Sequence, residues 1–528
     1  MTRTNLTALE IGTFILYLAG IVAIGFISGR KGHQNTTRFF LAGRGLPWYV
    51  IGFSLIAASI SSEQFIGEVG WGYKYGMAVC NWEWLVWPAQ GILLLFFLPI
   101  YLKNKIFTIP EYLTRRFGRL AGTVFSFVCM IQYLVINLPL VLYSGGFLLN
   151  RVFGLDLRLA IWLLVVVTGS YTIFGGLSSV AWVDFLNGAL LIGGGLLVFA
   201  LGVNAVPGGI KEVIGTGDRA HLVLPASHPD LPWTGILAVA VVMSGYYYST
   251  NQYITQRCLG AKSQWNGKMG VVLAAFLALP LGLAVTWPGM IAHALNPGLE
   301  HADMAYPFLI GRVVPVGLRG IMFAVLFGAI VSTVDALINS ASSLLTLDVY
   351  KGLVNKEASE RRLVRFAQWA GSLFLIFGAL WSPMVGRFGS IFSYAQDSWA
   401  LMLAPVMAAF FLAIFWKRMT RAAALAALVL AVPMLVLVYL RQFSGLLAGV
   451  NIFNLSGLIF IISIVLIGIV SFISTPPSGE SLETTLWRRG VVRLPDEEVR
   501  DGYPWWKRVS VWFTVVVLIF IVIYTVFW

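Results

Sequence analysis

The sequence contains little charge, cysteine or histidine. Of its 528 residues, 11% are charged, 3 are cysteines and 5 are histidines. The cysteines are too few for a disulfide framework or a metal cluster, and no two histidines have the spacing of a haem or zinc site across a membrane. No glycine-rich phosphate loop ending in Lys-Ser/Thr occurs, and the longest hydrophilic stretch, residues 475–507, is too short for a nucleotide-binding domain. These absences argue against a redox protein, against ATP as the energy source and, with no nucleophile–base pair, against an enzyme.

Apolar residues dominate the chain instead. The composition is 58% hydrophobic and 14% aromatic, with a mean hydropathy of +0.83. Such values are typical of an all-α polytopic membrane protein. Fourteen apolar segments are long enough to span a bilayer: 9–29, 47–71, 78–102, 120–149, 158–175, 182–205, 234–256, 270–296, 316–347, 363–382, 388–416, 421–441, 453–474 and 508–528.

The basic residues predict the orientation. The net charge is +13, and 26 of the 36 basic residues, Arg116 and Arg257 among them, fall in alternate loops. The positive-inside rule places these loops in the cytoplasm and both termini outside a cell (plasma or inner) membrane. The excess charge is therefore a topology signal with some attraction to membrane lipid, and not a sign of nucleic-acid binding. The first segment is not expected to be a cleaved signal peptide, because its basic cluster follows it.

Two of the segments carry polar interruptions at membrane depth. The second contains residues 54–64, with four serines, a glutamate and a glutamine, and the seventh contains residues 244–252, which are rich in tyrosine and serine. Small and hydroxyl residues weaken a helix, and a broken helix in a membrane exposes carbonyls that bind hard cations. The two interruptions are five spans apart, an odd number, which indicates an inverted repeat of a transporter.

Carboxylates inside apolar segments are costly and indicate function. The candidates are Glu63, Glu68, Glu83, Asp184, Asp335 and Asp397. Glu68 falls near the end of its segment, so a position at the water interface is an equal alternative. Glu83 lies between two tryptophans, a combination that suits a polyhydroxylated ligand, because the carboxylate accepts hydroxyl protons while rings cover C–H faces.

The ninth segment predicts a sodium site. Ala329, Ser332 and Thr333 share one helix face through their i, i+3, i+4 spacing. If this face meets the break in the second segment, the carbonyls of Ala57 and Ile60 complete a shell of five oxygens, which suits sodium. The alternative is that the two hydroxyls only bond back to carbonyls of their own helix.

A second cation site is a further hypothesis. Asp335 lies next to this face, and Asp184 of the sixth segment could meet it, with Ser332 as the third ligand. The alternative is that one carboxyl is protonated and bonded to the other with no ion present.

At these residues the chain resembles the sodium/solute symporter family, most of all its sodium/glucose cotransporter branch. The matching motifs occur in family order: 38–44, 61–67, 107–112, 175–178 with Trp182 and Asp184, 251–253 with Gln256 and Arg257, Ser332 with Thr333, and 415–417. The resemblance implies a LeuT-like fold with about 14 transmembrane helices and a ten-helix core of two inverted five-helix repeats. The implied division is an N-terminal peripheral helix and loop (1–46), a first repeat (47–205), an extracellular loop (206–233), a second repeat (234–416) and C-terminal peripheral helices (417–528) with the cytoplasmic loop 475–507.

The resemblance also assigns site residues. It implies sodium at Ala57, Ile60, Ala329, Ser332 and Thr333, and a further sodium at Asp184 in some members. It implies that sugar hydroxyls are bound by Gln64, Glu83 and Gln396 together with the position of Ser244. It also implies that Tyr247 stacks on the sugar and closes the inward path. The outer gate is implied to be Trp82 and Phe392. Three polar positions of sugar-transporting members differ: an asparagine is Ser244, a serine is Val86 and a lysine is Ala278. At about 1 kcal/mol per hydrogen bond, these losses argue against simple hexose selectivity.

The sequence therefore predicts a symporter that couples inward sodium flow to uptake of a sugar, polyol or inositol by alternating access. One alternative is a sodium or proton symporter for a small carboxylate or amino acid, although Glu83 would repel an anionic solute. Another is a transporter-like membrane sensor, although no signalling domain is present. Nothing in the pattern indicates an oligomeric state.

Overall fold

The computed structural model describes residues 7–61, 63–387, 391–447, 449–476, 481–499 and 504–528. These residues form helices and no named strand, with one isolated bridge between Leu46 and Ala261. The helices are α1 Ala8–Gly29, α2 Thr36–Leu41, α3 Trp48–Ser59, α4 Val69–Tyr75, α5 Asn81–Trp84, α6 Trp87–Ile92, α7 Leu98–Lys103, α8 Ile109–Phe117, α9 Arg119–Ile131, α10 Leu138–Phe153, α11 Leu157–Ala205, α12 Gly209–Ile214, α13 Trp233–Ala238, α14 Ser244–Ser249, α15 Gln252–Leu259, α16 Gln264–Val285, α17 Trp287–Leu295, α18 Ala305–Val313, α19 Arg319–Ser343, α20 Glu360–Trp381, α21 Ile391–Phe415, α22 Arg421–Ser444, α23 Ile452–Ile473, α24 Ser481–Thr485 and α25 Val509–Val526.

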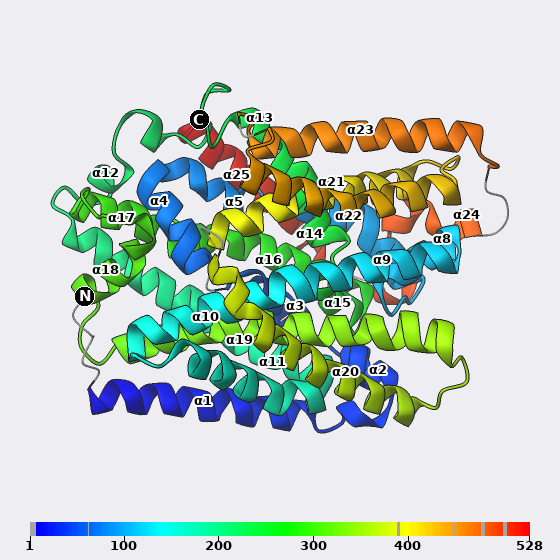
Figure 1. The fold of residues 1–528 in the computed structure, drawn as a ribbon, viewed down its shortest axis with the longest axis horizontal. Helices are drawn as coiled ribbons and strands as arrows, with labels where there is room; N and C mark the ends of the chain where they lie inside the picture. The colour runs from blue at the N-terminus through cyan, green and yellow to red at the C-terminus, as the bar shows by residue number, and fades with distance from the viewer. Residues whose placement is uncertain (1–6, 62, 388–390, 448, 477–480, 500–503) are drawn as a thin grey trace.

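The helices run roughly parallel to the long axis of the molecule (Figure 1). Within the described chain, 11 helical runs are long and apolar enough to cross a membrane. This is the structure expected in lipid, because a helix satisfies its own backbone hydrogen bonds where no water is available. The chain is a multi-pass membrane protein.

The 11 runs and the fourteen predicted segments differ because some runs contain two adjoining helices and some segments are divided into short helices. Segments 158–175 and 182–205 form two helices within α11, separated by a kink at Gly176, whose backbone is not helical (φ 60°, ψ −156°). A Cβ at Gly176 would lie 2.3 Å from the Phe39 carbonyl oxygen, so only glycine fits this close approach. Conversely, segment 234–256 is divided among the short helices α13, α14 and α15. The count of fourteen stays a prediction.

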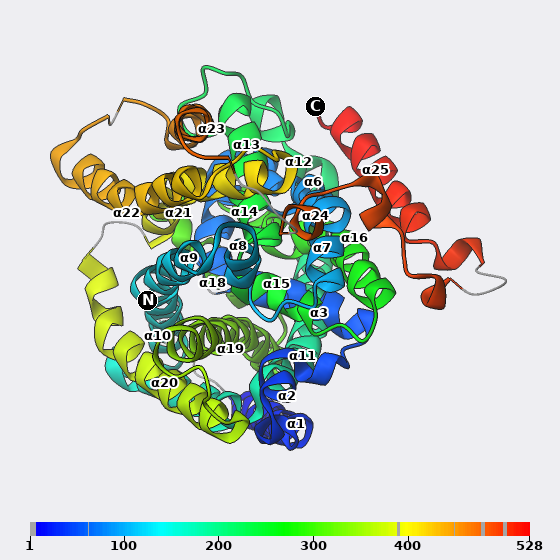
Figure 2. The ribbon, with the colours of Figure 1, turned by 90° about the vertical axis from the view of Figure 1, so that its right-hand side faces the viewer.

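Burial separates a core from a periphery. In the apolar stretch of α19, 94% of residues are buried, against 11% in α25. Helix α19 packs against α11, α1 and α3, and α16 packs against α3. Figure 2 shows α3, α15 and α19 inside the bundle, with α1, α20, α22, α23 and α25 on its outside. The polar residues of interest therefore lie on buried elements.

The start of α1 and the C-terminus lie on one side of the bundle. In Figure 1 both lie toward the side of α12 and α17, whereas α2, α8 and α24 lie at the opposite end. The backbone N–H of Leu222, in the loop after α12, donates to the carbonyl of Phe527 at 2.7 Å. The C-terminus is thus attached to the loop 206–233.

Candidate functional site: two broken helices and the polar groups between them

The first break lies in the second predicted segment, as the serine-rich pattern predicted. Helix α3 ends at Ser59, Ile60 is extended (φ −110°, ψ 127°), and a π-helical turn follows over Gln64–Glu68. The Gln64 amide bridges the gap: Oε1 accepts from the Ser61 N–H at 2.8 Å, and Nε2 donates to the Ser59 carbonyl at 3.2 Å. Gln64, predicted to bind solute, is therefore engaged in closing the break.

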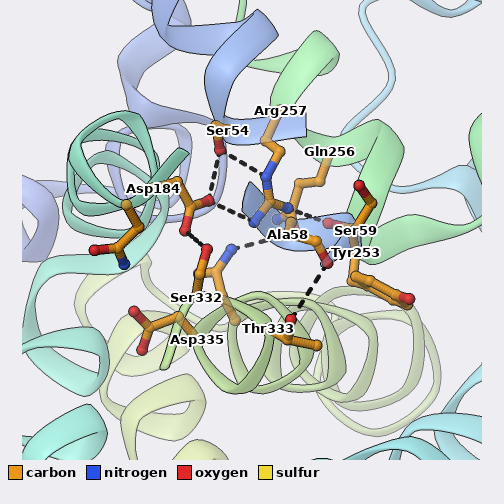
Figure 3. A network of polar contacts seen from close by, with 12 residues as sticks. Ser54, Ala58, Ser59, Asp184, Tyr253, Gln256, Arg257, Ser332, Thr333 and Asp335 are labelled. Carbon is orange, nitrogen blue, oxygen red and sulfur yellow. Dashed lines mark hydrogen bonds and ion pairs between the residues drawn. The ribbon is translucent and has the colours of Figure 1, made fainter. Parts of the chain in front are cut away.

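The hydroxyl of Thr333 on α19 faces the carbonyls of this break. Its Oγ1 lies 3.2 Å from the carbonyl oxygens of Ile60 and Ala329 and 3.5 Å from that of Ala58 (Figure 3). A hydroxyl has one proton, so it can donate to one of these carbonyls only, and the others keep free lone pairs directed at the same point. In the described residues Thr333 has no hydrogen bond with the Ala57 carbonyl, the one that the sequence had predicted beside Ile60. Four oxygens from two helices thus converge.

Asp184 on α11 is the centre of a second, fully buried network. Arg257 Nη2 on α15 donates to Asp184 Oδ2 at 2.8 Å, and Ser54 Oγ on α3 donates to the same oxygen at 2.6 Å. Arg257 Nε also donates to Ser54 Oγ at 2.7 Å, and Ser332 Oγ donates to Asp184 Oδ1. Figure 3 shows the guanidinium beside the Ser54–Asp184 pair, with contacts to both residues. Ser332, predicted as a ligand of both cation sites, contacts Asp184 here.

Asp335 belongs to a separate set of contacts. Its two oxygens accept hydrogen bonds from Tyr171 and Thr172, both on α11. In the described structure no hydrogen bond joins Asp335 to Asp184. Of the second cation site that the sequence predicted, the structure brings together Asp184 and Ser332, while the charge of Asp184 is balanced by Arg257.

Arg257 was misplaced by sequence reasoning. It had been counted among the basic residues of cytoplasmic loops, but its side chain is 1% exposed and paired with Asp184. Arg116, counted in the same way, is buried too and donates to the carbonyls of Ala413 and Trp416 at 3.3 and 3.2 Å. The available signal was Asp184 itself, because a carboxylate in the middle of an apolar segment requires a partner.

The second break lies in the seventh predicted segment. Helix α14 ends at Ser249 and α15 begins at Gln252, with Asn251 in an extended conformation between them. The Tyr133 hydroxyl donates to Asn251 Oδ1 at 2.6 Å and accepts from the Gln252 N–H at 3.0 Å. The Gln252 side-chain oxygen accepts from the Ile109 N–H at 2.7 Å. Groups from neighbouring helices thus contact this break, although the buried Ser249 Oγ, Asn251 Nδ2 and Gln252 Nε2 have no hydrogen-bond partner among the described residues.

The remaining residues predicted to bind solute lie on helices α5, α21 and α14. Glu83 on α5 is 6% exposed and Gln396 on α21 is 4% exposed, and the Gln396 Oε1 has no hydrogen-bond partner within the described residues. Tyr247 is half-buried, with its ring 5.3 Å from that of Tyr248 and 5.6 Å from that of Tyr253. Carboxylate, amide and aromatic groups are thus present on α5, α21 and α14.

The predicted gate residues differ in what the structure describes. The Trp82 ring is half-buried and lies 5.5 Å from the rings of both Trp71 and Phe453. The side chain of Phe392 lies outside the described residues. Ser244, at the start of α14, is half-buried.

Glu68 does not lie at a water interface, the alternative that its position near a segment end had allowed. It is 1% exposed and accepts a 2.6 Å hydrogen bond from the Thr286 hydroxyl at the α16–α17 junction. Nearness to a segment end did not indicate exposure of Glu68, because other parts of the chain cover this part of the bundle.

A buried helical core with a broken helix facing a hydroxyl-bearing helix defines a membrane transporter, and the chain belongs to the sodium:solute symporter family. The family model matches residues 39–431. Among individual relatives, the sodium/glucose cotransporter of Vibrio parahaemolyticus is 34% identical over 462 residues, covering 81% of this chain and 84% of the relative. The sodium/myo-inositol cotransporter of Mus musculus is 31% identical over 547 residues, covering 92% of this chain and 76% of the relative.

The solved structures agree on the fold. A sodium-coupled sialic acid symporter in a substrate-bound outward-open state superimposes with a TM-score of 0.79 at 22% identity, covering 89% of this chain and 99% of that one. The prediction of an all-α polytopic membrane protein with the LeuT-like architecture is confirmed.

Proposed function

We infer that the protein is a secondary active symporter that couples inward sodium flow to uptake of a sugar or a related polyhydroxylated solute by alternating access. The observation that carries this conclusion is the convergence of the Ile60, Ala329 and Ala58 carbonyls on the single hydroxyl of Thr333. Carbonyl and hydroxyl oxygens without a carboxylate suit a monovalent hard cation. The family membership and the sugar and inositol cotransporters among the relatives support the same conclusion.

Sodium in this position would join the break of the second segment to α19. Thr333 would then turn its lone pairs, and not its proton, to the ion, so that both elements share one ligand. The bound ion would hold the break and α19 at one separation, which is the property needed to make solute access depend on sodium. A 100 mV potential adds about 2.3 kcal/mol per imported charge, enough for an accumulation of several tens of fold.

The solute is proposed to bind among Glu83, Gln396 and Tyr247, with Ser244 and Gln64 at the edge of the site. Glu83 accepts hydroxyl protons, the unpartnered Oε1 of Gln396 is available as a further acceptor, and the Tyr247 ring covers an apolar sugar face. Trp82 and Phe392 are proposed as the outer gate. A buried carboxylate favours a neutral polyol over an anion.

The repeats and the membrane orientation are proposed as follows. The repeats are assigned to 47–205 and 234–416, and both termini to the outside of the cell membrane. The hydrogen bond between the C-terminus and the loop 206–233 supports one common side for these parts. The protein is a transporter whose partners are sodium, the solute and lipid, without catalysis.

The test is uptake of labelled hexoses, inositols and linear polyols into proteoliposomes, with and without an inward sodium gradient. We expect one compound to accumulate above its external concentration only with the gradient. Protein-free liposomes are the control for leak. Equal uptake with and without sodium, or accumulation of an amino acid or carboxylate instead of every polyol, would contradict the proposal.

A further inference from the structure

Two buried carboxyl groups lie against each other beside the proposed solute site. Glu68 ends the π-helical turn of the first broken helix, and Glu83 is on α5. Their side chains are 1% and 6% exposed and interact directly. The Thr286 hydroxyl donates to Glu68 Oε1 at 2.6 Å, whereas the buried Glu68 Oε2 has no hydrogen-bond partner among the described residues.

Among the described residues, no cation forms an ion pair with either carboxyl group. The ion pairs of the described residues are Lys74–Asp230, Arg115–Glu111 and Arg257–Asp184. The titratable groups that face the pair are Cys80, just before α5, and Tyr248 on α14. A thiol and a phenol are both neutral at physiological pH and supply no positive charge. Two ionised carboxylates would therefore repel each other in a site that water cannot screen.

A structural hydrogen bond does not explain Glu68. The Thr286 hydroxyl needs one acceptor, and a glutamine carbonyl would serve as well as a carboxylate. The second oxygen of Glu68 is buried and has no hydrogen-bond partner among the described residues, while its side chain interacts with that of Glu83. An oxygen in this position is satisfied when a proton lies between the two carboxyl groups, as in other pairs of carboxyls that share a site.

We propose that Glu68 and Glu83 together hold one proton and that solute binding requires this proton. The inference rests on the proposed solute site at Glu83. The proton comes from the aqueous medium and binds one carboxyl oxygen. The resulting O–H group donates a hydrogen bond to the ionised partner. The pair then carries a single negative charge, and Glu83 keeps a lone pair for a solute hydroxyl. When the proton leaves, two like charges separate the side chains and disturb the site.

Uptake kinetics test the requirement. Sodium-driven uptake is measured in proteoliposomes at fixed sodium from about pH 6 to about pH 9, and the solute KM is followed. In the unmodified protein, KM rises by about tenfold per pH unit once the shared proton dissociates, the slope for one linked proton. In Glu68→Gln the KM changes by less than about twofold over the same range, because position 68 can no longer ionise. An equal slope in both proteins, or no slope in the unmodified protein, overturns the proposal.

Thr286→Val is the matched control. It removes the hydrogen bond to Glu68 and keeps both carboxyl groups, so the slope persists even if its midpoint moves. A flat profile in Thr286→Val would mean that the hydrogen bond, and not a shared proton, causes the pH dependence.

A measurement without solute separates this inference from the proposed function. Infrared difference spectra of the purified protein, recorded between low and high pH, report the carbonyl stretch of a neutral carboxylic acid. We expect loss of one such band in the unmodified protein and in Thr286→Val, and its absence in Glu68→Gln and in Glu83→Gln. Identical spectra in all four proteins overturn the shared proton. If the bands behave as expected while no polyol is transported, the proton site stands and the proposed solute class fails.

Discussion

The two broken helices satisfy their free backbone groups in different ways. At the first break, the Gln64 amide of the same segment closes the gap, and one hydroxyl, that of Thr333, faces three carbonyls. At the second break, Tyr133 and the Ile109 N–H from neighbouring helices contact Asn251 and Gln252. The first break therefore has more carbonyl oxygens than the one hydroxyl proton can satisfy, whereas side-chain and backbone groups of other helices bond to the second break. Free carbonyl oxygens suit a bound ion, whereas bonds to other helices hold a break in one conformation.

One ion pair connects the two broken helices. Arg257 follows the second break on α15, and its Nε donates to Ser54 of α3, ahead of the first break. Both groups contact Asp184 of α11, so one buried charge pair joins the helices that carry the two breaks. The following predictions separate the roles of the two breaks and of their connection.

The largest effect is expected from Arg257→Met, which removes the cation and leaves Asp184 buried and uncompensated. An unpaired buried charge costs about 3–5 kcal/mol, so the free energy of unfolding in detergent should fall by that amount. Denaturant or thermal unfolding of the purified protein measures it. The double variant Arg257→Met/Asp184→Asn removes both charges and should recover most of the loss. If the single and double variants were equally stable, the unpaired charge of Asp184 would not be the cause of the loss in the free energy of unfolding.

An intermediate effect is expected from Tyr133→Phe, which deprives the second break of a donor and an acceptor. Two lost hydrogen bonds, each about 1 kcal/mol, should lower the free energy of unfolding by about 2 kcal/mol and leave the sodium dependence of uptake unchanged. Tyr101→Phe is the graded comparison, because the Tyr101 hydroxyl makes one bond to the same break, to the Ser249 carbonyl at 3.1 Å. A large change in sodium dependence in Tyr133→Phe would mean that the second break also participates in ion binding.

The smallest effect on stability, confined to the first break, is expected from Thr333→Val. This variant keeps the shape of the side chain and removes the oxygen proposed to bind sodium. The sodium concentration for half-maximal uptake should rise by about tenfold, which corresponds to about 1.4 kcal/mol, with little change in unfolding. Ser343→Ala is the control on the same helix, because that hydroxyl bonds back to the Ser340 carbonyl at 2.8 Å. Unchanged sodium dependence in Thr333→Val would remove the proposed ion site.

Features that depend on spacing along one helix could be predicted. The serine-rich stretch before Gln64 and the tyrosine-rich stretch before Gln252 both break their helices, as the loss of helix-forming residues indicated. Thr333 and Ala329 meet because residues four apart share a helix face. Such relations need no knowledge of the neighbouring helices.

Features that depend on which helices meet could not be predicted. Asp335 was expected near Asp184, and the hydrogen bonds of its carboxylate go to Tyr171 and Thr172 of the same helix, α11. Arg257 was read as a loop charge because the segment's apolarity ends near it, although the fold buries it against α11. Gln64 was expected to bind solute, and its amide also bridges a break whose exact residues only the folded backbone defines.

The sequence alone determined that this chain crosses a membrane many times, where its helices break, and which residues could offer oxygen to a cation, because these properties follow from composition and helical periodicity. The tertiary structure decided that Arg257 neutralises Asp184 and that Asp335 bonds to α11. These contacts join segments far apart in the chain, and each buried polar group takes whichever partner the packing of the helices brings within reach, a choice that no periodicity along a single helix contains.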